Sequence, residues 1–490
     1  MLNRTLVLAL VLILPVACLA EDLPELPPET QELIDQARAA PPEFSAGLLL
    51  KLVASPLITD PKWKLQLAEE AFAAGGHAQL PYTHYCHVRV DVIQCQERDS
   101  RGLDVLALQR RAVETVLPLK PQRAVEMFLS IVPPKVAGVT CADPVTPNVS
   151  AYYVTAGTVF ERGFTAAQRK EGEDLRFLET CIASMTSPVH VPPLLKMLST
   201  AKLRAEDRAA LLSRFAVTLE RVAGSDREFG TGEWMVVPTA SPETPPGRYL
   251  PRPVLPEMPD AALFVPALRA YIVRQLSGPR CSDRIGEDEL PMSASNFNAL
   301  AANLDPDGTR IKPIIAEEVK PLRDDGTFKY RLPWQSDRAK KVLAEERWLH
   351  HGNRKLPDSQ RFWILEERST SEWLARAADF MRLIEGWRED EEASPGEHFW
   401  LTAQAYSLLA RLMPPGSERE NAMDRYLNFL ETSYAPDRSR VLWLVWVRDM
   451  LDRARSTKDA GERKWILNSL ARSRSAVIRL YARIENVTTQ

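Results

Sequence analysis

The sequence predicts an all-α protein built of stacked helical hairpins, solenoid-like or irregular, with one minor β-hairpin near residues 310–331. Three observations support this prediction. Helix start signals recur along the chain, apolar residues recur at intervals of three and four, and glycine is scarce, at 21 of 490 residues. Few glycines argue against folds rich in β-turns, whereas 38 prolines indicate many separate elements.

Clear helix starts lie in the N-terminal half. Asp60 followed by Pro61 fits an N-cap with proline at the first helical position. Thr165 and Gln168 have the spacing of a capping box. The segment 206–223 carries apolar residues three and four apart. We therefore expect helices at all three places.

The C-terminal third contains three capping-box patterns in a row, at Ser369–Glu372, Ser394–Glu397 and Ser417–Glu420. Their spacing predicts helices of about 15–20 residues, two of which make a hairpin of about 45 residues. That size is typical of tetratricopeptide and HEAT arrays. The tetratricopeptide consensus is absent and no residue-level repeat is found, so the stacking is inferred from length alone.

Two segments interrupt the helical pattern. Residues 238–259 hold eight prolines and predict an extended loop or linker. Asp325-Gly326 between two alternating segments predicts the β-hairpin. The expected organisation is a signal peptide (1–20), an N-terminal helical module with most cysteines (21–237), the linker (238–259), a helix-plus-hairpin connector (260–334) and a tryptophan-rich helical module (335–490).

The N-terminus has the three parts of a secretory signal. Arg4 supplies the positive charge, residues 6–16 form an apolar run, and small residues precede a cleavage site after Ala20. An alternative is a lipoprotein attached through Cys18. No later stretch is apolar enough to span a membrane. We expect an exported protein, periplasmic or extracellular, with no transmembrane segment once the signal is removed.

An oxidising compartment makes disulfides plausible, but the mature chain has an odd number of cysteines. The disulfide candidates are Cys86, Cys95, Cys141, Cys181 and Cys281. A metal site is also conceivable, because His84, Cys86, His87 and Cys95 are zinc-type ligands close together in the sequence. Their spacing matches no established finger, and a local disulfide between Cys86 and Cys95 is the competing interpretation. No cofactor is expected.

Other constellations have simpler explanations. Residues 303–308 imitate the opening of a calcium loop, but Ile314 stands where that loop needs a glutamate. Glu346 with His350 lacks the metalloprotease pattern, and Glu397 beside His398 already belongs to a capping box. The chain has no nucleophile elbow, phosphate loop or dinucleotide fingerprint.

Charge and composition limit the classes of function that the chain can have. Sixty-two Lys+Arg against 65 Asp+Glu give a net charge of −3, which argues against nucleic-acid binding through bulk charge. The leading expectation is a non-enzymatic scaffold that binds a protein or peptide partner along stacked helices. The alternative is an enzyme or binding module for polysaccharide, with sugars stacking on tryptophans and acids drawn from residues 389–392. Its tryptophans are Trp348, Trp363, Trp373, Trp387 and Trp400.

Several N-terminal stretches carry a resemblance: LDVLALQRRAV (103–113), QRAVEMF (122–128), CADP (141–144) and SAYY (150–153). They look like segments of uncharacterised secreted α-helical proteins of environmental bacteria. The resemblance covers the N-terminal half and implies no activity, cofactor or site.

The C-terminal segment 458–484 predicts one amphipathic helix. Its apolar residues form a stripe, and residues 451–490 carry nine Lys+Arg against four Asp+Glu. A solenoid needs a terminal cap with a polar outer face, which is the expected role. The alternative is a helix that lies on an anionic membrane surface.

Overall fold

The computed structural model describes residues 23–80, 84–85, 101–134, 146–223, 260–277, 416–433, 440–457 and 460–488, with scattered residues between 302 and 413. Helices dominate this described part, which confirms the all-α prediction. None of the helices within it is long and apolar enough to cross a membrane. The expected signal peptide and Pro-rich linker lie outside it.

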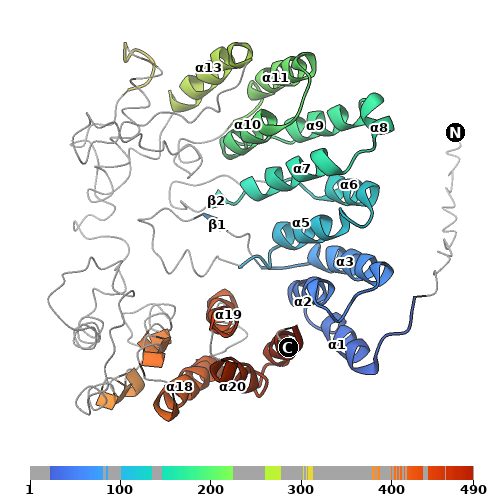
Figure 1. The fold of residues 1–490 in the computed structure, drawn as a ribbon. Coiled ribbons are helices and arrows are strands. Elements are labelled where there is room, and N and C mark those ends of the chain that lie inside the picture. The colour runs from blue at the N-terminus through green and yellow to red at the C-terminus, as the bar shows by residue number, and fades with distance from the viewer. Residues whose placement is uncertain are drawn as a thin grey trace, which may run out of the picture.

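The N-terminal helices form one curved stack in which helices close in the sequence pack on one another (Figure 1). The first five are α1 (Pro28–Arg38), α2 (Pro42–Ala54), α3 (Pro61–Gly75), α5 (Val105–Val116) and α6 (Pro121–Ser130). The stack continues with α7 (Ser150–Arg162), α8 (Ala166–Lys170), α9 (Glu173–Ala183), η1 (Pro188–His190), α10 (Val191–Thr200), α11 (Ala205–Leu219), η2 (Ala261–Leu263) and α13 (Val265–Leu276).

Helix starts follow the predicted signals. The Asp60 carboxylate accepts hydrogen bonds from the backbone N–H groups of Lys62 and Trp63, at 2.9 and 3.0 Å, and so caps α3. Thr165 and Gln168 form the reciprocal capping box at the start of α8. Both predictions are confirmed.

Close helix packing depends on small residues at some crossings. A Cβ atom on Gly75 of α3 would lie 2.9 Å from the Cβ of Leu108 on α5, so only glycine permits this approach. Leu108 is fully buried at this contact, and Leu67 of α3 is fully buried as well. Tight packing of this kind makes the stack one continuous apolar core.

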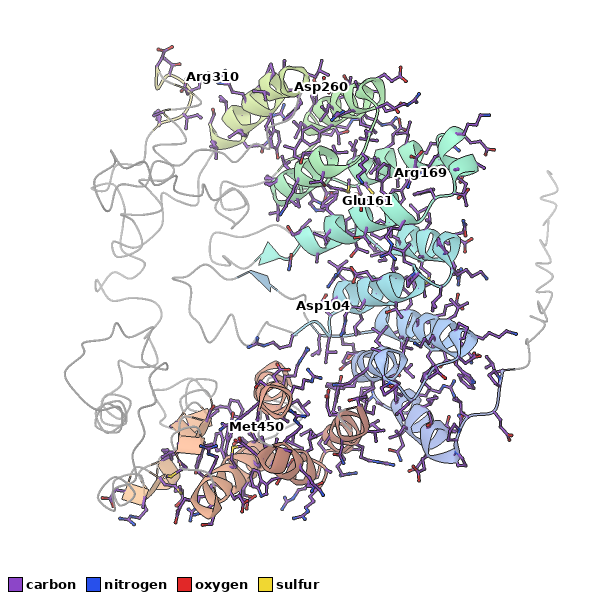
Figure 2. The ribbon with its side chains drawn as sticks, viewed as in Figure 1. Asp104, Glu161, Arg169, Asp260, Arg310 and Met450 are labelled. Atoms are coloured by element: carbon purple, nitrogen blue, oxygen red, sulfur yellow. The ribbon has the colours of Figure 1, made fainter. Side chains whose placement is uncertain are left out.

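Arg169 ties three consecutive helices together farther along the stack (Figure 2). Its guanidinium donates to the carbonyl oxygens of Phe160 and Glu161, at 2.6 and 2.9 Å, and pairs with Asp174 at 3.1 Å. One side chain therefore satisfies carbonyls left open at the end of α7 while anchoring the first turn of α9.

The C-terminal helices are α18 (Ser417–Ser433), α19 (Arg440–Ser456), α20 (Ala460–Leu470) and α21 (Ala476–Thr488). The single helix predicted over 458–484 is wrong, since residues 471–475 separate α20 from α21. Ser473 accepts from the Ser475 N–H at 3.1 Å, and Glu431 accepts from the Arg474 N–H at 3.0 Å. These bonds satisfy backbone groups that a continuous helix would otherwise use, so the break is stable.

Helices from the two ends of the described chain pack against each other. Helix α21 packs against α1 and α2 as well as against α19 and α20. Figure 1 shows the C-terminal helices gathered beside the N-terminal end of the stack. Ile34 of α1, Leu48 of α2 and Ile484 of α21 are all fully buried. The contact is therefore part of the apolar core.

The described strands are very short. β1 (His84–Tyr85) and β2 (Thr146–Pro147) pair antiparallel, with His84 opposite Pro147. Only residues 310–312 of the hairpin expected over 310–331 are described. Just before them, Asp305 accepts from the N–H groups of Arg310 and Ile311 at 2.7 and 2.8 Å. The carboxylate that suggested a calcium loop thus closes a turn.

Candidate functional site

A pocket of about 440 Å³ lies where the two ends of the chain meet. Helices α2 and α5 form one side, and α19 and α21 form the other. Figure 2 labels Asp104 at the start of α5 and Met450 on α19, the helices that face each other across it. The lining residues are Gly47, Leu50, Lys51, Ala54, Leu103, Arg111, Glu114, Thr115, Val447, Arg448, Leu451, Asp452, Arg455 and Tyr481.

Gly47 and Tyr481 set the depth of this pocket. A Cβ atom on Gly47 would lie 2.8 Å from the Tyr481 hydroxyl oxygen and 2.8 Å from Leu103 Cδ2. Glycine therefore lets the α21 tyrosine reach the backbone of α2. Lys51 follows Gly47 one helical turn later, and its Nζ lies 5.8 Å from the centre of the Tyr481 ring. That distance allows a cation–π contact.

The acidic groups around the pocket already have partners. Glu114 accepts from Arg110 and from the Thr155 hydroxyl, both at 2.8 Å. Asp452 pairs with Arg455 at 2.9 Å. Glu485 is buried behind the pocket wall. It pairs with Lys51 and accepts from Arg455 Nε at 3.0 Å.

Two arginines of the lining lack such carboxylate partners within the described part of the chain. Arg111 donates to the carbonyl oxygens of Gly102 and Ala107, at 2.8 and 3.3 Å. Arg448 donates to the carbonyl oxygen of Arg101. A carbonyl carries only a partial charge, so these bonds do not neutralise the positive charge of the two arginines that line the pocket. Four cationic side chains line the pocket against two acidic ones.

Burial and neighbouring cations act together on Lys51. Burial is the main cause that lowers its pKa from 10.5 to about 7, and Arg455 and Arg448 lower it further. Asp452 opposes them, and so does the ion pair with Glu485. The pKa remains low because the ammonium lies among guanidiniums in a poorly solvated site.

Two further groups of the pocket, Arg111 and Tyr481, have shifted pKa values that agree with this picture. Burial lowers the pKa of Arg111, and the like charge of Arg448 contributes. Burial raises the pKa of Tyr481, although Arg448 and Arg111 favour its ionised form. The pocket is thus both partly desolvated and electropositive.

A second polar cluster is sealed in the core. His190 is fully buried, with Nδ1 3.0 Å from the Tyr153 hydroxyl and Nε2 3.1 Å from the Pro134 carbonyl. Burial lowers the pKa of His190 to about 4, so the ring is neutral at physiological pH. A neutral ring that donates to the carbonyl must carry its proton on Nε2 and accept from Tyr153 at Nδ1. This cluster is structural.

The cysteine and metal candidates fall mainly outside the described residues. Cys181 is described: its thiol is free and buried, and burial raises its pKa to about 12. A buried, protonated thiol of this kind is unreactive. No group of three or more His, Cys, Asp or Glu able to hold a metal occurs in the part that the structure describes. The candidates whose side chains lie outside it are His84, Cys86, His87, Cys95, Cys141 and Cys281.

The structure does not test the prediction that tryptophans bind polysaccharide. Trp348, Trp363, Trp373, Trp387 and Trp400 all lie outside the described residues, so the polysaccharide alternative stays a prediction. Elsewhere, Trp63 is buried in the stack and Trp465 packs partly buried against the core.

Sequence reasoning missed the pocket. The basic character of residues 451–490 was the available signal, and it includes Arg455. Lys51 is a single cation on an otherwise apolar helix, and Arg111 follows Arg110 on an amphipathic one. Nothing in the linear pattern predicts that they face α19, because that depends on the two chain ends meeting.

The comparisons with known proteins assign nothing to this site. No protein-family model matches the chain, and no curated protein matches its sequence.

Proposed function

We propose that the chain is an exported helical scaffold that binds a protein or peptide partner, and that the pocket between its two ends is the recognition site. The observation that carries this proposal is the pocket itself, with two arginines that lack carboxylate partners in the described chain. Its volume falls within the range of about 300–1,000 Å³ found for ligand sites.

The arrangement of the helices supports a binding role. Stacked helices present extended curved surfaces on which a partner can lie, and the pocket lies where the first helices of that stack meet α19 and α21. Its lining combines cations, aliphatic side chains and one tyrosine. This mixture can anchor a charged chain end or an apolar side chain of a partner.

A selection experiment tests the proposal. A library of displayed random peptides is selected against residues 21–490 and counter-selected against Arg111→Glu combined with Arg448→Glu. We expect enriched peptides that bind the unaltered chain and lose about tenfold or more in affinity for the variant, since two attractive charges become repulsive. The matched control is Arg204→Glu, at the arginine just before α11, whose side chain is 72% exposed and which is distant in sequence from the pocket residues.

Two outcomes contradict the proposal. One is a selection that enriches nothing above the background of the display particle. The other is a set of peptides that bind the double variant and the unaltered chain equally. Circular dichroism melting of each variant separates loss of binding from loss of folding.

A further inference from the structure

The charged side chains of the pocket share its lining with an apolar surface. Leu50, Ala54 and Leu103 contribute from the N-terminal helices, and Val447 and Leu451 from α19. A ligand that fills this space must offer both a negative charge and an apolar group. A small hydrated inorganic anion would leave the aliphatic side chains uncovered.

We propose that the pocket binds a carboxylate carried on an apolar residue, namely the C-terminal residue of a partner peptide. This inference rests on the proposed function and names the part of the partner that is recognised. The carboxylate meets Arg111 from one side and Arg448 from the other. The last side chain of the peptide packs against Leu50 and Leu451.

The electrostatics of the pocket favour such a ligand. Arg111 and Lys51 belong to the N-terminal stack, whereas Arg448 and Arg455 belong to α19. Bringing these like charges together costs free energy, and the acids nearby are already engaged. An incoming carboxylate placed between the two sides attracts both, so its binding also strengthens the contact between the chain ends.

A carboxylate suits these donors. A guanidinium presents parallel N–H groups that match the two oxygens of a carboxylate, and such pairs are strongest where water is partly excluded. Arg111 already has Nε and one terminal nitrogen directed at carbonyl oxygens, which fixes the plane of its guanidinium. The remaining N–H groups of Arg111 are therefore held in place before the ligand arrives, which lowers the entropic cost of binding.

Protonation of Lys51 gives the site a recognisable pH dependence. A bound carboxylate favours the ammonium form, so binding draws a proton onto Lys51 when its pKa in the free protein is about 7. The affinity for the carboxylate ligand then falls as the pH rises above about 7. The ligand carboxylate itself stays ionised over this whole pH range. The charged and titratable groups that face Lys51 are Arg111 from α5, Arg448, Asp452 and Arg455 from α19, and Tyr481 and Glu485 from α21.

Calorimetry with matched ligands tests the inference on residues 21–490. The probes are one glycine–serine peptide ending in leucine with a free carboxylate, the same peptide as its C-terminal amide, and decanoate as a free apolar acid. We expect the acid peptide to bind about tenfold or more tightly than the amide at about pH 6 and to weaken toward about pH 8.5.

Variants locate the binding site. Arg448→Gln should weaken the acid peptide about tenfold and leave the amide unchanged, since one charge-assisted pair is lost. Arg111→Lys keeps the charge but loses the fork, and should weaken binding in the same direction. Lys51→Met should abolish the decline with pH. Arg204→Gln is the control and should bind as the unaltered chain does.

Each contrary result has a distinct meaning. Equal binding of acid and amide, or no effect of Arg448→Gln and Arg111→Lys in variants that melt normally, overturns this inference. If display selection yields peptides that are indifferent to amidation, the scaffold proposal stands and the carboxylate inference falls. If decanoate binds and no peptide does, the partner is a free acid, which overturns both the peptide source and the proposed function.

Discussion

At the scale of single residues, burial decides what a polar group does. His190 and Lys51 both have lowered pKa values, caused mainly by burial in each case. His190 has hydrogen-bond partners for both ring nitrogens and no access to solvent, so the neutral ring has a structural role in the core. Lys51 lines a pocket, so its reduced basicity bears on a ligand.

His190 makes stability depend on pH in a definite window. Its pKa is 6.5 when exposed and about 4 in the folded protein, so the unfolded chain binds the proton more readily between those values. The contribution of neutral His190 to the free energy of unfolding is therefore fully present above about pH 6.5. It falls by about 3 kcal/mol as the pH drops to about 4. Urea unfolding of His190→Gln against the unaltered chain measures this.

Glutamine can retain the hydrogen bond to the Pro134 carbonyl, because its amide nitrogen takes the place of Nε2, and it does not titrate. The difference in unfolding free energy between the two proteins should then shift in favour of the glutamine variant as pH falls through the window. A difference that stays constant from about pH 7 to about pH 4 would mean that His190 has the same pKa in the folded and unfolded states, so that burial does not lower it.

At the scale of elements, local signals determine where helices start. Asp60→Ala removes the acceptor for two N–H groups of α3 and should destabilise the protein by about 1 kcal/mol, measured by urea unfolding. Asp60→Ser keeps a capping oxygen and should cost only a few tenths of that. If alanine and serine are equally harmful, the loss comes from the charge of Asp60 rather than from its cap.

Helix starts were predictable from the sequence, whereas contacts between distant segments were not. The caps at Asp60 and Thr165 and the all-α class were predictable, because caps and periodicity act within a few neighbouring residues. The division of the C-terminal segment into α20 and α21 was not, because it depends on Glu431, which comes from a different helix. The pocket was unpredictable for the same reason: its residues come from four helices of the two chain ends.

At the scale of the whole molecule, α21 joins the end of the chain to its beginning. The amphipathic stripe predicted a helix that caps the C-terminal module. In the structure α21 also packs on α1 and α2, and its Ile478, Leu480 and Ile484 are buried. Arg483 reaches Gln36 on α1 at 3.0 Å. Removing α21 therefore affects both ends of the chain.

Truncation after Leu470 tests this joining role. It removes the apolar face of α21 and leaves Lys51 without Glu485. We expect a clear loss of stability, of at least about 3 kcal/mol, because several fully buried side chains are lost together. Hydrogen exchange should become faster in α1 and α2 as well as in α19 and α20. Faster exchange at both places would show that α21 stabilises both ends of the chain, and not the C-terminal helices alone.

The membrane alternative gives the opposite pattern. If α21 lies on anionic lipid, the truncated chain should melt as the full chain does and lose its binding to vesicles that contain phosphatidylserine. Arg472→Gln with Arg474→Gln is the matched control, since both side chains are exposed in the segment between α20 and α21. This control should leave the melting temperature within about 2 °C of the unaltered chain. Faster exchange confined to α19 and α20 would also contradict the joining role, because α1 and α2 would then be stable without α21.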